Sequence, residues 1–466
     1  MEKLSAKSVA DATGGRIIKG EAGLEACGVS IDSRTAGEGD VFFALKGAKA
    51  DAHDFVGGAY DNGCRMIVIS REEAAKLVPD DACVILTGDT LIALQELSHW
   101  YISRFDMKKV AVTGSVGKTT TRDMIYAILR RKYITGASKA NLNSESGMPL
   151  ALLGFTHEMQ AAVIEMGMDG AGQIRRLAEI AGPDMAVITN IGISHIEILG
   201  SRENIFKAKM EIAERFSEEN TLVINSDDDY LATLKEEELP YRIVRAGTGS
   251  TADFRATDIE DLGDRGVRFS LITPEGTMPI RLAVPGSHNA VNAALAAACC
   301  FVLGVPVEDI PSGLAHTEMT GNRLRIKAAG DVKLIDDTYN ASPESMKSAI
   351  TTLAKSEGMR KVAVLGAMNE LGELSDESHD DVGRFAAEAG IELLVTIGEK
   401  GAQIGDAAKR ERAEIEVRCF ESKESVYPLI RDIFKEGDTI LIKASRTIEL
   451  ELLAERIEEA FAGKGK

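Results

Sequence analysis

The chain of 466 residues lacks the features that would place it in a membrane or outside the cell. It has no long, charge-free apolar run of the kind that spans a bilayer. Its first segment, MEKLSAKSVADATGG, has no apolar signal core. Its six cysteines include no CxxC pair, so neither a disulfide framework nor a zinc ribbon is favoured. We expect a cytoplasmic protein with small buried thiols.

The sequence is also short of positive charge. It has 54 Lys and Arg against 73 Asp and Glu, which gives a formal net charge of −19. Nucleic acids and anionic membrane surfaces repel such a polyanion, so we expect neither nucleic acid binding nor stable membrane insertion. A small phosphorylated ligand is compatible with this charge, because it needs only a local site.

Length alone predicts two to four domains, and the pattern of apolar runs favours three, of which the last two are of the α/β class. The first, residues 1–106, holds short strand-like runs such as VFFAL and ends in a helix predicted over 89–104. The second, residues 107–315, contains the runs AAVIEMGM, MAVITNIGISH and NTLVINSDD, which are typical of buried parallel strands. Its segment 253–284 alternates and carries turn signals, which predicts an antiparallel patch.

The third domain, residues 316–466, repeats the pattern of buried strands and helices. KLIDDTY, KVAVLGAM, ELLVTIGE and DTILIKAS are short apolar runs separated by helical segments. Such a pattern predicts a second open parallel sheet.

A phosphate-binding loop is the clearest motif. The segment TGSVGKTTT follows the strand KVAV and precedes an amphipathic helix. Glycines let backbone N–H groups approach phosphate oxygens, the helix N-terminus attracts anions, the lysine reaches the terminal phosphates and the next threonine binds Mg²⁺. The motif is shorter than the usual one, since Val112 stands where a Gly is expected. The alternative is a Gly-rich turn with an exposed lysine. The predicted contacts are Gly114, Ser115, Val116, Gly117, Lys118, Thr119 and Thr120.

Two further side chains stand at strand ends. Glu165 ends the strand AAVIE, and His195 follows MAVITNIGIS. Parallel strands bring both to the edge that carries the phosphate loop, where they could hold Mg²⁺. The alternatives are a solvated carboxylate and an ordinary hydrogen-bonded histidine.

Lys209 lies in an unexpected place. In the predicted helix ENIFKAKMEIAERF it shares one face with Ile205, Ile212 and Phe216, whereas Lys207 points elsewhere. Lys209 either extends its amine to water or is held in a site whose surroundings change the chemical reactivity of that amine.

These motifs together resemble the Mur ligases of bacterial cell-wall synthesis, over nearly the whole chain. The resemblance rests on the order and spacing of DSRTAGEGDVFFALKG, TGSVGKTTT, NLNSESGMPLALL, TNIGISHIEILGSRENIFKAKMEI, PGSHNAVNAALAAA, GNRLR, DDTYNASPESM and KASRTIELE. It implies an N-terminal UDP-binding domain, a central ATPase domain and a C-terminal Rossmann-like domain. The segments DDTYNASPESM and NLNSESGMPL resemble the corresponding segments of the family member that adds D-alanyl-D-alanine to UDP-N-acetylmuramoyl-tripeptide.

The resemblance also implies roles for individual residues. Glu165, His195 and a carbamylated Lys209 would surround one of two Mg²⁺ ions, and Thr119 with Glu165 would bind the other. Lys118 with these metal-binding groups would carry the catalysis. Asn289 and Asn292 would flank the adenine, Arg323 would reach the phosphates and Asp337 would hold the ribose. The substrate contacts would be Ser33, Arg34, Asn143, Ser144, Tyr339 and Asn340, although the family often has Asn where Ser144 stands.

The implied protein is a monomeric ligase with ATP, Mg²⁺ and small-molecule substrates. A sibling amide ligase acting on a folate or a poly-amino acid is an alternative, which the UDP-binding segment disfavours. A phosphate-loop binding switch without ligase chemistry is another, which Glu165, His195 and Lys209 disfavour.

Overall fold

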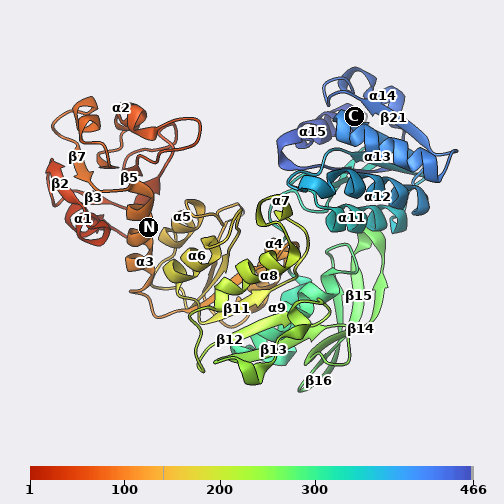
Figure 1. Ribbon diagram of the computed structural model, residues 1–466, viewed down its shortest axis with the longest axis horizontal. Coiled ribbons are helices and arrows are strands. Elements are labelled where there is room, and N and C mark those ends of the chain that lie inside the picture. Colours follow the sequence, from red (N-terminus) through yellow and green to blue (C-terminus); the bar gives the residue numbers. More distant parts are fainter. Residues whose placement is uncertain (140, 463–466) are drawn as a thin grey trace.

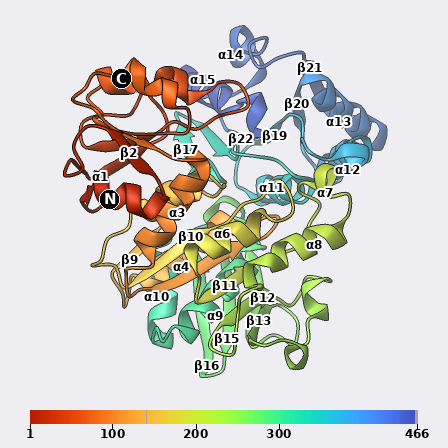
Figure 2. The same cartoon turned by 60° about the vertical axis from the view of Figure 1, so that its left-hand side comes forward.

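The computed structural model describes residues 1–139 and 141–462. Three large sheets follow one another along the chain, each in its own lobe (Figure 1). Figure 2 shows the N-terminal lobe, in red and orange, and the C-terminal lobe, in blue, both above the central lobe. The predicted α/β fold with three domains is confirmed.

The N-terminal lobe is built on a mixed five-stranded sheet with helix α1 (Ala6–Thr13) and helix α2 (Val56–Asp61). The strand order is β2 (Arg16–Lys19), β7 (Cys83–Leu86), β6 (Met66–Ile69), β5 (Asp40–Phe43) and β4 (Gly28–Ser30), and a short β1–β3 pair (Leu4–Ser5, Glu25–Ala26) lies beside it.

Helix α3 (Thr90–Ile102) connects this lobe to the centre. Asp89 begins it, because the Asp89 carboxylate accepts hydrogen bonds from the N–H groups of Leu91 and Ile92. It packs on helices α5 (Gly147–Leu153) and α6 (Gln173–Ala181) of the central lobe. The helix predicted over 89–104 is therefore confirmed in slightly shorter form.

The central lobe contains a nine-stranded sheet. Its order is β16 (Gly276–Leu282), β15 (Val267–Thr273), β14 (Phe254–Asp261), β13 (Arg242–Gly247), β12 (Thr221–Asn225), β11 (Met185–Ile188), β8 (Lys108–Thr113), β10 (Ala161–Glu165) and β9 (Thr135–Ala137). All neighbouring pairs from β14 to β9 are parallel. The pairs β14–β15 and β15–β16 are antiparallel, as predicted for 253–284.

Both faces of the central sheet are covered, which explains its continuous apolar strands. Val110 and Val112 of β8 face one core, with helices α4 (Lys118–Leu129) and α9 (Asn289–Val302). Ala111 between them faces the other core, with α6 and α8 (Arg202–Met210). Successive side chains of β8 thus point to opposite faces of the sheet, and each face is covered by helices. The phosphate loop, which follows β8, therefore lies between two layers of helices.

The C-terminal lobe has a six-stranded sheet in the order β17 (Arg325–Ala329), β18 (Val332–Asp336), β22 (Asp438–Lys443), β19 (Arg360–Leu365), β20 (Leu393–Ile397) and β21 (Glu416–Phe420). Only the pair β17–β18 is antiparallel among these strands. Helices α11 (Pro343–Lys355), α12 (Ser375–Glu388) and α13 (Gly398–Glu411) cover one face. Helices α14 (Ile430–Ile433) and α15 (Glu451–Ala462) cover the other.

The central and C-terminal lobes are in direct contact. The end of helix α11 and the start of β18 meet the turn after β14, where Lys355 pairs with Asp261 at 3.1 Å and Lys333 pairs with Asp264. The contact brings the carboxyl ends of both parallel sheets to one cavity, where ligands of open α/β sheets bind.

All six cysteines are free thiols. Cys64, Cys83, Cys299 and Cys300 are buried as predicted, but Cys27 and Cys419 are exposed, because they lie at the rims of their sheets. No helix within residues 1–139 and 141–462 is long and apolar enough to cross a membrane.

Candidate active site

The phosphate loop joins β8 to α4. Two of its glycines have positive φ angles, +148° at Gly114 and +84° at Gly117. A Cβ at Gly114 would lie 1.8 Å from Thr189 Oγ1, and one at Gly117 would lie 2.8 Å from Asn292 Oδ1. Both positions therefore require glycine, for backbone conformation as well as for space.

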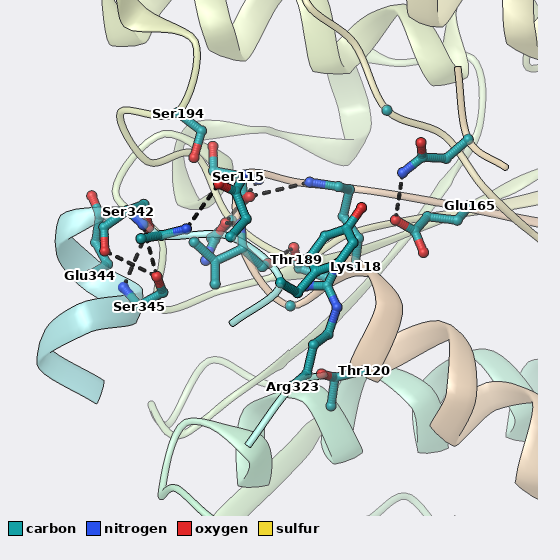
Figure 3. Close-up of a pocket in the computed structure, with 18 of the residues that line it drawn as sticks. Ser115, Lys118, Thr120, Glu165, Thr189, Ser194, Arg323, Ser342, Glu344 and Ser345 are labelled. Carbon is teal, nitrogen blue, oxygen red and sulfur yellow. Dashed lines mark hydrogen bonds between the residues drawn. The ribbon is translucent and has the colours of Figure 1, made fainter. Parts of the chain in front are cut away.

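Lys118 begins helix α4 and folds back over the loop. Its ammonium donates to the carbonyls of Gly114 at 2.8 Å and Ser115 at 3.2 Å, and Figure 3 shows Lys118 together with Ser115. Burial lowers the pKa of Lys118 to about 8, with Glu165 opposing the shift and the positive charge of Arg323 adding to it. An anion bound at the loop would raise the pKa of this lysine again, because a nearby negative charge favours the charged form.

Glu165 ends β10 and is buried, with 2% of its surface exposed. Its Oε2 accepts from the Thr119 hydroxyl at 2.9 Å, and its Oε1 accepts from Asn143 Nδ2 at 2.8 Å. Hydroxyl and carboxylate oxygens at the edge of the loop are ligands that suit Mg²⁺.

Lys209 lies in the cavity wall with 2% of its surface exposed, and the other members of its predicted face, Ile205, Ile212 and Phe216, are also buried. Its amine has no hydrogen-bond or ion-pair partner within the described residues. Burial, and then the charge of Lys118, move the pKa of Lys209 well below its ordinary value. Lys207 is exposed and pairs with Glu203 at 2.6 Å.

Helix α8 is shorter than the helix predicted over residues 203–216. It ends at Met210, and a 3₁₀ turn follows over Glu211–Ala213. The Glu211 carboxylate there accepts from the N–H groups of Gly172 and Arg175, at the start of α6.

His195 stands at the start of helix α7 (Ile196–Leu199) with a positive φ of 65°. Its Nδ1 lies 2.7 Å from Glu370 Oε2, across the boundary between the lobes. The imidazole holds the pKa of the Glu370 carboxyl below its ordinary value. His195 and Glu165 line the same cavity. Within residues 1–139 and 141–462, no group of three His, Cys, Asp or Glu side chains could hold a metal ion, so a third ligand would come from another residue type, such as Thr119 or a modified Lys209.

The residues expected at the adenine occupy the first turn of α9. Asn289 and Asn292 are buried, and Asn292 Nδ2 donates to Asn289 Oδ1 at 2.8 Å. They face the phosphate loop, because Gly117 lies against Asn292.

The C-terminal lobe contributes a second set of side chains. The Arg323 guanidinium lies 4.0 Å from the centre of the Tyr339 ring, and Figure 3 shows it beside Lys118 and Thr120. Lys443 at the end of β22 donates to Asp337 Oδ2 at 2.6 Å and to the carbonyl of Asn340 at 2.8 Å. Residues of both lobes therefore meet in one place.

One cavity of about 870 Å³ collects most of the predicted site. The sequence-predicted residues that line it are Ser115, Val116, Gly117, Lys118, Thr120, Asn143, Ser144, Glu165, His195, Lys209, Asn289, Asn292, Arg323, Asp337, Tyr339 and Asn340. Gly114 and Thr119 lie just behind this wall, through their contacts with Lys118 and Glu165.

Ser33 and Arg34 lie apart from the cavity, in the N-terminal lobe. Arg34 is exposed and pairs with Asp32 at 2.6 Å, and the Ser33 carbonyl accepts from Asn62. Arg34 lowers the pKa of Asp32 to about 2. A ligand that touches both places must therefore be long.

Sequence reasoning missed Lys443, Glu370 and Asn190 as site residues. Asn190 Oδ1 accepts from the N–H groups of Ser115 and Val116, at 3.0 and 2.9 Å. Asn190 and Lys443 both follow apolar strand runs, which is a signal that could have indicated them. Glu370 had no such signal, because its role depends on contact between two lobes.

Comparison with known families gives three matches along the chain. Residues 25–101 match the model of the Mur ligase family catalytic domain, residues 112–300 the Mur ligase middle domain, and residues 322–446 the Mur ligase glutamate ligase domain.

Comparison with individual proteins gives relatives over nearly the whole length. The UDP-N-acetylmuramoyl-tripeptide–D-alanyl-D-alanine ligase of Bacillus subtilis is 36% identical, over 93% of each chain. The ligase of the same name from Escherichia coli is 33% identical, over 92% of this chain and 93% of that one. A crystal structure of MurF from Acinetobacter baumannii superposes with a TM-score of 0.88 at 33% identity, covering 98% of this chain and 99% of that chain. MurF ligase from Thermotoga maritima in complex with ADP has a TM-score of 0.77 at 28% identity, over 93% and 97% of the two chains.

Proposed function

Since this chain belongs to the Mur ligase family, we propose that it joins D-alanyl-D-alanine to UDP-N-acetylmuramoyl-tripeptide. ATP is converted to ADP and phosphate in the same reaction. The observation that carries the proposal is the cavity between the two lobes, where the phosphate loop and Lys209 of one lobe face Arg323 and Lys443 of the other.

The chemistry requires activation of a carboxylate, because its leaving group would otherwise be oxide. A carboxylate oxygen of the tripeptide attacks the γ-phosphorus of ATP, and the bond from that phosphorus to ADP breaks. The amine of the dipeptide, once deprotonated, attacks the acyl carbon of the acyl phosphate. The tetrahedral intermediate then expels phosphate and leaves the amide.

Two anions, the γ-phosphate and the carboxylate, must approach each other in the first step. Lys118 and Arg323 are placed to offset this repulsion, since both cationic groups face the same cavity. Closure of the lobes around the bound substrates would exclude water and so protect the acyl phosphate from hydrolysis.

Magnesium fits the oxygen ligands at the loop, and when bound it neutralises phosphate charge. We propose two Mg²⁺ positions, one at Thr119 and Glu165 and one at Glu165, His195 and Lys209. Lys209 would take the second position as a carbamate, because its buried, unpartnered amine favours the neutral form that captures CO₂.

The remaining proposed contacts to ATP and substrate lie in or beside the same cavity, except for two residues of the N-terminal lobe. The Gly114–Thr120 loop holds the ATP phosphates, Asn289 and Asn292 flank the adenine, and Asp337 holds the ribose. The substrate contacts are Asn143, Ser144, Tyr339 and Asn340 around the reacting groups, with Ser33 and Arg34 at the UDP end.

We further propose domain limits at residues 1–106, 107–315 and 316–466. These limits fall between Leu86 and Lys108, and between Leu282 and Arg325, so no sheet crosses either of them. A monomer in the cytoplasm is the proposed working form, and free thiols suit that reducing compartment.

The test is phosphate release by the full-length protein. ATP is supplied with UDP-tripeptides ending in lysine or diaminopimelate, each with and without D-alanyl-D-alanine. We expect release only when one UDP-tripeptide and the dipeptide are both present. Release with a folate or another acid would favour a sibling ligase, and ATP binding without turnover on any substrate pair would contradict ligase chemistry.

A further inference from the structure

Arg122, on helix α4 directly after the phosphate loop, is buried almost completely, with 1% of its surface exposed. A buried guanidinium is costly unless its N–H groups find acceptors. Its Nε and Nη2 donate to Asp123 Oδ1 at 3.0 and 2.6 Å. Its Nη1 donates to the Ser138 carbonyl at 2.8 Å and contacts Glu165 Oε2 at 3.4 Å. Arg122 thus connects helix α4 to the carboxylate proposed to bind Mg²⁺.

The other oxygen of Asp123 holds the segment between the lobes. This linker, residues 316–324, runs from helix α10 (Ile310–Ala315) to β17. Asp123 Oδ2 accepts from the Thr320 N–H at 2.9 Å and from the Thr320 hydroxyl at 3.0 Å. Arg122 Nη2 also donates to the Thr320 hydroxyl. Arg122, Asp123 and Thr320 form a closed set of contacts, which we call the linker clamp.

The far end of the linker is held by the C-terminal lobe. The Asn322 carbonyl accepts from the Tyr339 N–H at 3.2 Å, and the Leu324 N–H donates to Asp337 Oδ1 at 3.2 Å. Arg323 lies between these two contacts, three residues after the clamp. Its position relative to the phosphate loop is therefore determined by Thr320 on one side and by its own lobe on the other.

We propose that Arg122 and Asp123 are positioning residues, which clamp the linker at Thr320 and thereby place Arg323 against the phosphate loop. Neither residue is among those that line the cavity. The proposal rests on the function proposed above, since the placement matters for catalysis when Arg323 meets phosphate. A misplacement of about 1 Å at a reacting group can lower a rate by roughly a factor of 10².

A variant of the linker itself tests the clamp without removing a buried charge. Thr320→Val deletes the hydroxyl that both clamp side chains contact, and Thr320→Ser keeps it. Thr317→Val is the matched control, because the Thr317 hydroxyl, in the same linker, is buried with no hydrogen-bond partner within the described residues.

The first measurement is hydrogen exchange of the linker amides in the full-length protein, without nucleotide or Mg²⁺. One hydrogen bond of ordinary strength is worth about a factor of five in a local opening equilibrium. We expect linker amides to exchange about fivefold faster in Thr320→Val. Thr320→Ser and Thr317→Val should exchange as the unchanged protein does.

The second measurement distinguishes misplacement of Arg323 from a general loss of stability in the linker. In Thr320→Val, kcat for ligation should fall about fivefold or more. The KM for the UDP-tripeptide should change much less, because the UDP end is proposed to bind at Ser33 and Arg34 in the N-terminal lobe. Thr320→Ser should restore kcat. ADP affinity without Mg²⁺, measured by calorimetry, should weaken in Thr320→Val alone among the three variants.

Equal exchange in Thr320→Val and Thr317→Val would overturn the clamp. Faster exchange with unchanged kcat and unchanged ADP affinity would overturn the placement of Arg323. If the unchanged protein shows no ligation, the proposed function fails, and linker exchange and ADP affinity still decide the clamp.

Discussion

Lys209 is buried and has no hydrogen-bond or ion-pair partner among residues 1–139 and 141–462. Lys209 shares its buried face with Ile205 and Ile212, and the Lys118 ammonium repels it. Lys207, two positions earlier, is exposed and paired with Glu203. Two lysines on one short helix thus have opposite environments, which makes Lys207 an internal control for Lys209.

We expect Lys209→Ala to be nearly inactive and partly rescued by a small carboxylic acid, because the acid would supply the missing oxygen ligand. Lys207→Ala should have a mild effect. Carbon-13 NMR of the full-length enzyme in labelled bicarbonate checks the carbamate directly. Its signal should persist in Lys207→Ala and vanish in Lys209→Ala, and a signal equal in both variants would contradict the proposal.

A second prediction for a single residue concerns Lys118. Lys118→Ala should lower ligation by roughly 10²–10³, the range found when an electrostatic contact to a transition state is lost. The fold should persist, since the ammonium contacts its own loop and the cavity rather than an apolar core. Phosphate release and circular dichroism measure the two effects. Lys108→Ala, at the exposed start of β8, is the control, and near-normal turnover in Lys118→Ala would remove the phosphate-binding role.

At the scale of elements, a histidine connects helix α12 to the loop that carries Glu370. His379 is fully buried. Its Nε2 accepts from the Met368 N–H at 3.0 Å, and its Nδ1 donates to the Ser375 carbonyl at 2.6 Å. Burial is the main cause that lowers the pKa of His379 below its ordinary value of 6.5. The neutral ring is therefore part of the folded structure.

The stability of the C-terminal lobe should fall in mild acid for this reason. Below pH 6.5 the unfolded chain binds a proton at His379 that the folded chain does not, so unfolding becomes easier as pH falls, by up to about 1.4 kcal/mol per pH unit. Urea unfolding at pH 7.5 and 5.5 measures the effect. His379→Gln should show a smaller difference between the two pH values than the unchanged protein, whereas the surface variant His316→Gln should not. Equal pH dependence in all three proteins would exclude His379 as the cause.

At the scale of the whole molecule, the proposed substrate must bridge separate lobes. Arg34 lies in the N-terminal lobe, outside the cavity that Lys118 and Arg323 share. The central and C-terminal lobes already touch through Lys355 and Asp261. The N-terminal lobe is likewise in contact with the central lobe, because α3 packs on α5 and α6. A ligand that contacts both Arg34 and the cavity would draw these lobes closer together.

We expect the radius of gyration from X-ray scattering to decrease when UDP-tripeptide and an ATP analogue bind together. Arg34→Ala should require more UDP-tripeptide to reach the same compaction, because it removes a contact to the UDP end. Identical scattering with and without both ligands would show that the lobes do not move.

The sequence by itself determined the elements and the central half of the site. Strands buried on both faces read as continuous apolar runs, and the glycines and lysine of the loop are local requirements of phosphate binding. Lys209 could be singled out because helical spacing places it on an apolar face. The α/β fold with three domains followed from the same local patterns.

The tertiary structure alone decided what meets across the boundary between lobes. Glu370 against His195 and the clamp of Arg122 and Asp123 on Thr320 join residues far apart in the sequence. No periodicity or short motif encodes such pairs, because they depend on how two separately formed sheets dock. The physical reason is that patterning and turn chemistry act over a few residues, whereas the environment of a buried charge is set by every element packed around it.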